Sequence, residues 1–259
     1  MRNPGTPFEP VGCPRISLRS IRATGYDAAM DFHGRHVVVT GGAGGLGSAV
    51  VGALVEAGAL CHVPCFDAAE AQRFALREHK QVTVTVAGNL ADEAAVDRAF
   101  EGVAPLWASI HIAGGFAYGA LRDADLATLR QQIDMNLLSC LLCCRAAVQA
   151  MTAGGRIVNV AARPGLEWRS GANMAVYTAA KAGVAALTAA LAEEVVKDGI
   201  LANAVAPSIL DTAANRAAMP KADYALWPKV EEVAATILFL ASPDNRVTRG
   251  AIVPVYGKS

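Results

Sequence analysis

The 259-residue sequence predicts an α/β protein whose core is a doubly wound parallel sheet flanked by helices. Short β-branched runs alternate with longer alanine-rich segments of helical spacing, the order expected of parallel strands joined by right-handed helical crossovers. Several runs are apolar almost throughout, which is typical of strands buried on both faces. The first run also leads into a glycine-rich turn and then a helix, the arrangement of a Rossmann-type sheet.

The expected elements follow one another along the chain with no visible second domain. The apolar and β-branched runs predict strands at residues 36–40, 60–63, 82–86, 107–112, 156–160, 201–205 and 251–255. Segments with apolar residues at three- and four-residue spacing predict helices at residues 46–57, 68–78, 93–101, 126–151, 175–197 and 230–241. We therefore expect residues 30–259 to form a single domain.

Residues 1–29 differ from the rest of the chain in composition. They contain four prolines and several arginines, but no sustained apolar run that could serve as the core of a secretory signal. We expect a flexible N-terminal extension, and the arginines and serines leave an organelle-targeting segment as the alternative.

The charge balance argues against nucleic acid as a partner. Lys and Arg number 23, Asp and Glu also number 23, and no strongly basic stretch is present to bind a phosphate backbone. The apolar run at residues 135–144 is interrupted by Asn136 and Ser139 and is shorter than the roughly 18 residues of a membrane span. We expect a cytoplasmic protein that acts on a small molecule, with no nucleic-acid or membrane partner.

Six cysteines in a chain of this length form neither a disulfide framework nor a regular zinc pattern. Cys140, Cys143 and Cys144 share one face of an expected helix, a spacing that allows a metal site. No His or Asp is clustered beside them in the sequence. We therefore interpret them as small buried hydrophobic residues and expect no metal.

A glycine-rich turn directly follows the first expected strand. Its glycines permit a tight bend and let a pyrophosphate approach the backbone amides at the helix N-terminus, whose partial positive charge attracts an anion. Open α/β sheets bind ligands at this end of their strands. The turn therefore predicts a dinucleotide site that includes Gly41, Gly44, Gly45, Leu46 and Gly47.

Tyr177 and Lys181 lie four residues apart on one face of an expected helix. A lysine ammonium near a phenol lowers the pKa of the phenol, which lets a tyrosine exchange a proton near neutral pH. Such a pair is also common on solvated helix faces. The catalytic interpretation therefore depends on the dinucleotide turn upstream.

Together these motifs resemble those of the short-chain dehydrogenase/reductase family over residues 34–257. The family motif TGxxxGxG corresponds to residues 40–47, its helix asparagine to Asn136 in MNLLS, and its YxxxK to Tyr177 and Lys181. The resemblance implies an oxidoreductase that uses NAD or NADP. It further implies that Tyr177 supplies a proton, that Lys181 binds the nicotinamide ribose and lowers the tyrosine pKa, and that Asn136 holds a proton-relay water.

The resemblance also implies cofactor contacts outside the glycine turn. Family members contact the adenine after the third strand, the adenine ribose after the fourth and the nicotinamide carboxamide after the sixth. The corresponding residues here are Asn89, Leu90, Ala113, Gly114, Pro207, Ile209 and Thr212. For Ile209 and Thr212, an ordinary loop after a strand remains the alternative.

Two positions depart from the family pattern. The segment IVNVAARPG has Ala161 and Ala162 where the family has paired serines, so the catalytic serine is missing. Loss of one such oxyanion donor costs roughly 10²- to 10³-fold in rate. We interpret Ser170, further along the loop, as a solvated residue. His111 replaces the first asparagine of the family's NNAG, and we interpret it as a strand histidine packed against the sheet.

The sequence leaves the choice between NAD and NADP open. An acidic residue after the second strand binds the ribose hydroxyls of NAD, whereas basic residues there accept the 2′-phosphate of NADP. The expected acidic position is Cys65, with Asp67 two residues later, and Gly44 lacks the basic side chain found in many NADP users. Asp67 tilts the prediction slightly toward NAD.

Two further segments resemble dihydropteridine reductases within the same family. They are LDTAANRAAMPKADYALW at residues 210–227 and AGGFAYG at residues 113–119. Those enzymes also lack the serine, because a quinonoid pterin is a conjugated acceptor that takes hydride with less help than an isolated carbonyl. The resemblance implies a pterin-like substrate, with Phe116 and Trp168 available for stacking and a lid near residues 208–228.

Three functions are compatible with the sequence. The first is reduction of a small conjugated or carbonyl substrate, with Tyr177 as proton donor and dihydropteridine reductase-like activity as its specific form. The second is a ketone or 3-oxoacyl reductase that works without the serine, and the third is a catalytically inactive dinucleotide-binding sensor. The long apolar helices at residues 126–151 and 175–197 also favour a homodimer or homotetramer, as the family resemblance implies.

Overall fold

The computed structural model describes residues 30–103 and 105–259, so the expected N-terminal extension lies outside the described residues. Within this part of the chain, seven parallel strands form one sheet in the order β3-β2-β1-β4-β5-β6-β7. The winding reverses between β1 and β4, the point at which such sheets open a ligand crevice. The strands are β1 (His36–Thr40), β2 (Leu60–Cys65), β3 (Val82–Val86), β4 (Leu106–His111), β5 (Gly155–Val160), β6 (Ile200–Pro207) and β7 (Ile252–Val255).

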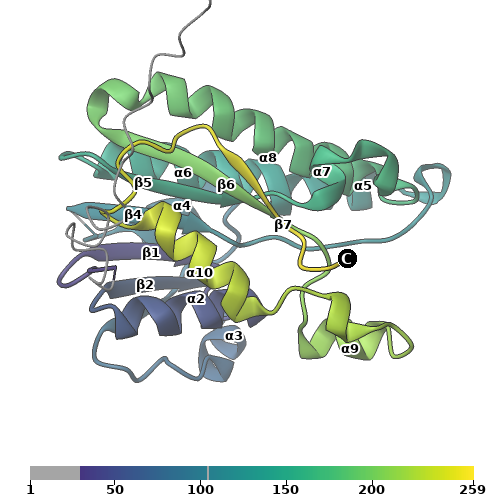
Figure 1. The fold of residues 1–259 in the computed structure, drawn as a ribbon, viewed down its shortest axis with the longest axis horizontal. Helices are drawn as coiled ribbons and strands as arrows, with labels where there is room; N and C mark the ends of the chain where they lie inside the picture. The colour runs from purple at the N-terminus through teal and green to yellow at the C-terminus, as the bar shows by residue number, and fades with distance from the viewer. Residues whose placement is uncertain (1–29, 104) are drawn as a thin grey trace, which may run out of the picture.

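Helices cover both faces of the sheet, which confirms the predicted doubly wound α/β fold (Figure 1). One face carries α2 (Gly45–Glu56), α3 (Ala68–Arg73) and α10 (Val230–Ala241). The other carries α4 (Glu93–Phe100), α5 (Leu126–Ile133), α6 (Ser139–Ala150) and α8 (Ala175–Glu194). The shorter helical elements are η1 (Leu121–Asp123), η2 (Asp134–Leu138), α7 (Arg163–Leu166), η3 (Trp168–Gly171), η4 (Val196–Asp198), α9 (Ala213–Ala218) and η5 (Tyr224–Leu226).

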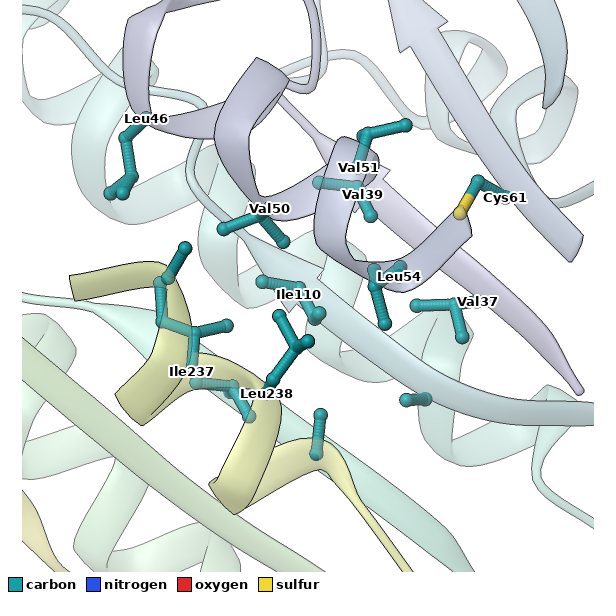
Figure 2. Packing of buried hydrophobic residues seen from close by; sticks show 14 of the residues in the cluster. Val37, Val39, Leu46, Val50, Val51, Leu54, Cys61, Ile110, Ile237 and Leu238 are labelled. Atoms are coloured by element: carbon teal, nitrogen blue, oxygen red, sulfur yellow. The ribbon is translucent and has the colours of Figure 1, made fainter. Parts of the chain in front are cut away.

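The hydrophobic core lies in two layers, one on each side of the sheet. Val37 and Val39 of β1 point into the layer beneath α2 and α10, where Leu54 and Ile237 meet Ile110 of β4 (Figure 2). Val38, between them in the sequence, belongs to the opposite layer. This alternation is the two-residue period of a strand, and burial on both faces explains the continuous apolar run in the sequence.

Two expected helices differ from the observed ones. The helix expected at residues 68–78 ends at Arg73, because Phe74 takes an extended backbone and buries its ring completely against the core. The helix expected at residues 126–151 is interrupted by η2, a π turn in which the Ser139 amide donates to the Asp134 carbonyl five residues back. Such turns are frequent at functional sites, and this one contains Asn136.

Burial along the strands depends on their place in the sheet. Both β5 and β6 are buried along their whole length, as the sequence predicts. The edge strand β3 is only partly covered, and Val86 is 51% exposed. The continuous apolar pattern therefore identifies central strands better than edge strands.

Two helical segments, Leu126–Ala150 and Ala175–Glu194, are long and apolar enough to cross a membrane by length and composition alone. Their most apolar windows are 33% and 39% buried in the fold. Both segments pack against the sheet, as core helices of soluble proteins of similar composition do. The length and composition of these two helices are therefore only weak evidence that the protein spans a membrane.

Candidate active site

A cavity of about 390 Å³ opens at the carboxyl ends of β1 to β4. It contains the whole predicted glycine turn and the predicted residues after β3 and β4. Sequence reasoning named Cys65 at the end of β2 but did not identify the contributions of Glu70 on α3 and Met135 in the π turn. The lining residues are Gly41, Gly44, Gly45, Leu46, Gly47, Pro64, Cys65, Phe66, Glu70, Gly88, Asn89, Leu90, Ile112, Ala113, Gly114, Met135 and Ser139.

The glycine turn has the shape that a pyrophosphate cradle requires. Gly41 has a φ of +67°, and a Cβ there would lie 2.7 Å from the Ala113 amide nitrogen. A Cβ at Gly47 would overlap the Gly41 carbonyl oxygen. The following helix, α2, has Gly44 at its N-cap and no capping side chain, so no side chain competes there for the first-turn amides. These residues fit the pyrophosphate of a dinucleotide.

The acidic residue in this cavity is Glu70, whereas the sequence pointed to Asp67. Asp67 instead caps α3 by accepting a hydrogen bond from the Glu70 amide at 2.7 Å, and it is absent from the cavity lining. The Glu70 carboxylate accepts from the Phe66 amide at 2.6 Å and does line the cavity. The spacing of Asp67 and Glu70 is that of a capping box, a signal in the sequence that predicts this exchange of roles.

Asn136 and Lys181 meet against the backbone of Gly114, which also lines the cavity. A Cβ at Gly114 would lie 2.7 Å from Asn136 Oδ1 and 3.4 Å from Lys181 Nζ. The Asn136 amide group donates to the Gly115 carbonyl at 2.9 Å and accepts from the Gly115 amide at 3.2 Å. Asn136 therefore holds the chain after β4 in place.

Tyr177 lies one helical turn from Lys181 on α8. The Lys181 ammonium is 6.0 Å from the centre of the Tyr177 ring and donates to the Val160 carbonyl at 2.8 Å. Phe116 packs edge-on against Tyr177, with the ring centres 5.1 Å apart and the planes at 89°. The structure thus brings the predicted catalytic residues Tyr177, Lys181 and Asn136 to one end of the sheet.

Tyr177 and Lys181 both have shifted pKa values. Burial raises the pKa of Tyr177 to about 12 and lowers the pKa of Lys181 to about 8. Burial is the cause of the raised tyrosine pKa, and the Lys181 ammonium hydrogen-bonds to the Val160 carbonyl, so the lowering of the tyrosine pKa by Lys181 stays a prediction. The Tyr177 phenol is therefore protonated at neutral pH, as an ordinary tyrosine is, and burial makes it a weaker acid than an exposed one.

Neither Ala162 nor Ser170 supplies the hydroxyl of the missing serine. Ala162 is 5% exposed and precedes α7 as its N-cap residue. Ser170 donates to the Glu167 carbonyl at 2.8 Å, within its own loop. No hydrogen bond reaches the Tyr177 hydroxyl from any of the residues 30–103 and 105–259.

The segment after β6 reaches the glycine turn through Thr212. Thr212 caps α9, and its methyl group would lie 3.1 Å from a Cβ at Gly45. Pro207 ends β6, and Ile209 is 43% exposed; neither lines the cavity. Arg216 pairs with Asp211 through two hydrogen bonds and braces the segment expected to act as a lid. Closure of that segment stays a prediction.

The three cysteines on α6 are buried, as predicted, at 6%, 1% and 2% exposure for Cys140, Cys143 and Cys144. However, the structure places His111 next to two of them, with its Nδ1 3.5 Å from Cys144 Sγ. The sequence separates His111 from these cysteines, so the local pattern contained no sign of this contact.

Comparison with known proteins identifies the family. Residues 35–223 match the model of the short chain dehydrogenase family. The chain is 31% identical over 246 residues to (2S)-[(R)-hydroxy(phenyl)methyl]succinyl-CoA dehydrogenase subunit BbsD of Thauera aromatica, covering 88% of this chain and 97% of the relative. It is 34% identical over 242 residues to cis-4-hydroxycyclohexanecarboxylate dehydrogenase of Sinomonas cyclohexanicum. That match covers 87% of this chain and 96% of the relative.

A solved structure agrees with this assignment. The crystal structure of gox2181 superposes with a TM-score of 0.81 at 30% identity, covering 88% of this chain and 96% of that one. Sequence, fold and site geometry therefore lead to one conclusion: the chain belongs to the short-chain dehydrogenase/reductase family and is an oxidoreductase that uses NAD or NADP.

Proposed function

We propose that this protein reduces a small conjugated or carbonyl substrate, with Tyr177 as the proton donor. The observation that carries the proposal is the placement of Lys181 against Gly114, which lines the dinucleotide cavity, with Tyr177 one helical turn from Lys181 on α8. Bound nicotinamide supplies or accepts a hydride. The chain's own residues orient the two partners and deliver the proton at the Tyr177 hydroxyl.

Each catalytic residue has a distinct task in this proposal. Tyr177 carries its proton at neutral pH and donates it to the atom that gains negative charge as hydride arrives. Lys181, fixed by the Val160 carbonyl, presents a positive charge to the ribose side of the site. Asn136 holds the Gly115 backbone and keeps the adjoining wall in shape.

The alanine at position 162 supports a conjugated substrate. Without a serine donor, negative charge on an isolated carbonyl oxygen receives less stabilisation, whereas a conjugated acceptor spreads that charge over several atoms. Phe116 is 59% exposed beside Tyr177 and offers a flat surface for an aromatic ring. The specific form of this proposal is activity on a pterin-like ring.

The relatives support a second candidate, oxidation of a secondary alcohol or reduction of a ketone or 3-oxoacyl group. They include the succinyl-CoA dehydrogenase subunit BbsD and the cis-4-hydroxycyclohexanecarboxylate dehydrogenase named above. The 3-oxoacyl-[acyl-carrier-protein] reductase MabA of Mycobacterium avium is a further relative, at 30% identity. In this case, Tyr177 would be the hydrogen-bond donor to the reacting oxygen, without help from a serine.

We further propose that the cofactor is NAD rather than NADP. Glu70 lines the cavity close to Phe66, at the end of β2 where the adenine ribose is expected. A carboxylate there accepts hydrogen bonds from ribose hydroxyls and repels a 2′-phosphate. Of the described residues that line the cavity, none is Lys or Arg.

The proposed setting is a cytoplasmic homodimer or homotetramer. The support is the apolar surface left on the long helices, including Ile133 and Leu141, which are 43% and 39% exposed. Sedimentation of the purified chain measures its oligomeric state.

The test follows nicotinamide absorbance with NADH and NADPH in parallel, against a quinonoid dihydropterin, a cyclic ketone and a 3-oxoacyl thioester. We expect turnover of one substrate class and a loss of roughly 10²- to 10⁴-fold in Tyr177→Phe. Tyr118→Phe, which removes an exposed hydroxyl hydrogen-bonded to Asn173, is the control and should keep full activity. Turnover that survives in Tyr177→Phe would contradict the role of Tyr177, and turnover of the ketone but not the pterin would decide for the second candidate.

A further inference from the structure

A buried cluster of metal-ligating side chains lies beneath the active site, in the layer between the sheet and α6. His111 ends β4 and Asn159 lies directly opposite it on β5, so both side chains project from the same face of the sheet. Cys140 and Cys144 lie one turn apart on α6 and face the same point. The ligand atoms of His111, Cys140 and Cys144 all lie within 4.8 Å of one another.

The three ligand atoms and Asn159 Oδ1 lie close enough together to surround one ion. Asn159 Oδ1 lies 2.8 Å from His111 Nδ1, 3.4 Å from Cys140 Sγ and 3.5 Å from Cys144 Sγ. Cys144 Sγ lies 3.5 Å from His111 Nδ1. At the usual zinc bond lengths, the ligands of a tetrahedral ion lie roughly 3.3–3.8 Å apart. The contacts that involve sulfur already have this spacing, whereas His111 Nδ1 and Asn159 Oδ1 would move apart by roughly 0.5 Å when the ion binds.

A second layer of hydrogen bonds orients two of the ligands. Asn159 Oδ1 can only accept a hydrogen bond, so the His111 Nδ1–H donates to it at 2.8 Å, and Ser109 Oγ donates to Nε2 at 2.8 Å. An ion bound at Nδ1 would move the proton to Nε2, where Ser109 Oγ can accept it. Asn159 donates its amide hydrogen to Thr188 Oγ1 at 2.9 Å, which turns Oδ1 toward the thiols. Outer partners of this kind are typical of built metal sites.

Charge and burial select the type of ion. Exposure is 3% for His111, 6% for Cys140, 2% for Cys144 and 0% for Asn159, so an uncompensated charge there would be costly. Two thiolates and one divalent cation sum to zero. Sulfur and imidazole ligands favour thiophilic ions over Ca²⁺ or Mg²⁺. With all four positions filled by protein, the site has no open position for substrate.

We propose that His111, Cys140, Cys144 and Asn159 form a closed structural site for a thiophilic divalent cation, Zn²⁺. The bound ion would join β4, β5 and α6 just below Asn136 and Gly114. Because all four ligands are buried, the ion would enter as the chain folds. The site would act on stability, and it takes no part in hydride or proton transfer.

The test compares full-length proteins produced in medium supplemented with zinc or with cobalt, with metal content measured by mass spectrometry. We expect about one ion per chain in the wild type, and sulfur-to-cobalt charge-transfer absorption in the cobalt form. Cys140→Ala and Cys144→Ala should retain less than about a tenth of an ion. Cys143→Ala removes a buried thiol from the same helix outside the cluster, so it should retain the full metal content.

Thermal unfolding gives a second readout that does not depend on activity. Removing zinc from the wild type and from Cys143→Ala should lower Tm by several degrees, whereas chelation should leave Tm of Cys140→Ala unchanged. A wild type without metal or cobalt bands would overturn the proposal. A Cys140→Ala variant that keeps its metal would also overturn it. The same holds if Cys140→Ala and Cys143→Ala lose equal amounts of metal.

Discussion

The cofactor side of the site and its catalytic side are built by different means. On the cofactor side, the turn between β1 and α2 is shaped by its own backbone, where the absence of a Cβ at Gly41 and Gly47 makes the bend possible. On the catalytic side, Asn136 and Lys181 each depend on a backbone group 21 residues away in the sequence. A local pattern therefore defines the first side, whereas the second depends on tertiary packing.

Among the substitutions considered, Gly47→Ala should have the largest effect, a loss of cofactor affinity. Its new Cβ would overlap the Gly41 carbonyl and lie 2.6 Å from Gly42 Cα, so the turn must open. We expect a rise of about 100-fold or more in the cofactor Kd, measured by calorimetric titration. Gly52→Ala, on the same helix with only Leu76 Cδ1 nearby at 3.9 Å, should keep the Kd and gain roughly 0.5–1 kcal/mol in stability. Equal affinities in the two variants would refute the steric argument.

The pH dependence of stability tests the buried ammonium on the catalytic side. The pKa of Lys181 is about 8 in the folded protein against 10.5 ordinarily, so the unfolded chain binds more protons between these values. The free energy of unfolding should rise with pH across that window, by up to about 3 kcal/mol relative to Lys181→Met, and lose this contribution as pH falls through 8. Urea unfolding of both proteins at about pH 7 and about pH 10 measures the difference. If the difference in free energy of unfolding between the two proteins does not change with pH, the Lys181 ammonium is solvated and not buried.

Ala162→Ser would restore the donor that the catalytic side lacks. If the geometry of Tyr177 and Lys181 is otherwise competent, ketone reduction should rise by about 10- to 100-fold in kcat/KM, while reduction of a conjugated ring should change little. Ala161→Ser places the hydroxyl in the core layer instead and should give no gain. Steady-state kinetics on both substrate classes separates these results. If Ala162→Ser leaves the kcat/KM for ketones unchanged, the missing serine is not what limits ketone reduction.

Substitutions at Glu70 and Asp67 test the cofactor side with the smallest effects. Glu70→Gln should shift the ratio of kcat/KM for NADPH over NADH upward by about tenfold, because repulsion of the 2′-phosphate is removed. Asp67→Ala should cost about 1 kcal/mol through loss of the α3 cap and leave that ratio unchanged. A shift in the ratio caused by Asp67→Ala alone would reverse the assignment made here.

The sequence predicts the fold and the cofactor cavity well because both arise from local rules. Continuous apolar runs locate the strands, and apolar residues at helical spacing locate the helices between them. The run of glycines locates the turn at residues 41–47. The position of Asp67 outside the cavity lining also has a local explanation, because its spacing to Glu70 favours helix capping.

The catalytic side is predicted less completely because its chemistry depends on surroundings. Tyr177 and Lys181 are adjacent as the motif requires, but the pKa of the tyrosine depends on how deeply the fold buries it. His111 meets Cys144 across 33 residues of sequence, a contact that only the packing of α6 on β4 creates. Neither property is contained in residue type and spacing alone.

The π turn at η2 constrains how this protein can vary. Each residue of an α-helix turns the chain by about 100°, so the extra residue in the turn sets which side chains of α6 face the sheet. Deleting one residue there would restore an ordinary helix, withdraw Asn136 from Gly115 and rotate Cys140 and Cys144 away from β4. The segment should therefore tolerate many substitutions in evolution but very few changes of length.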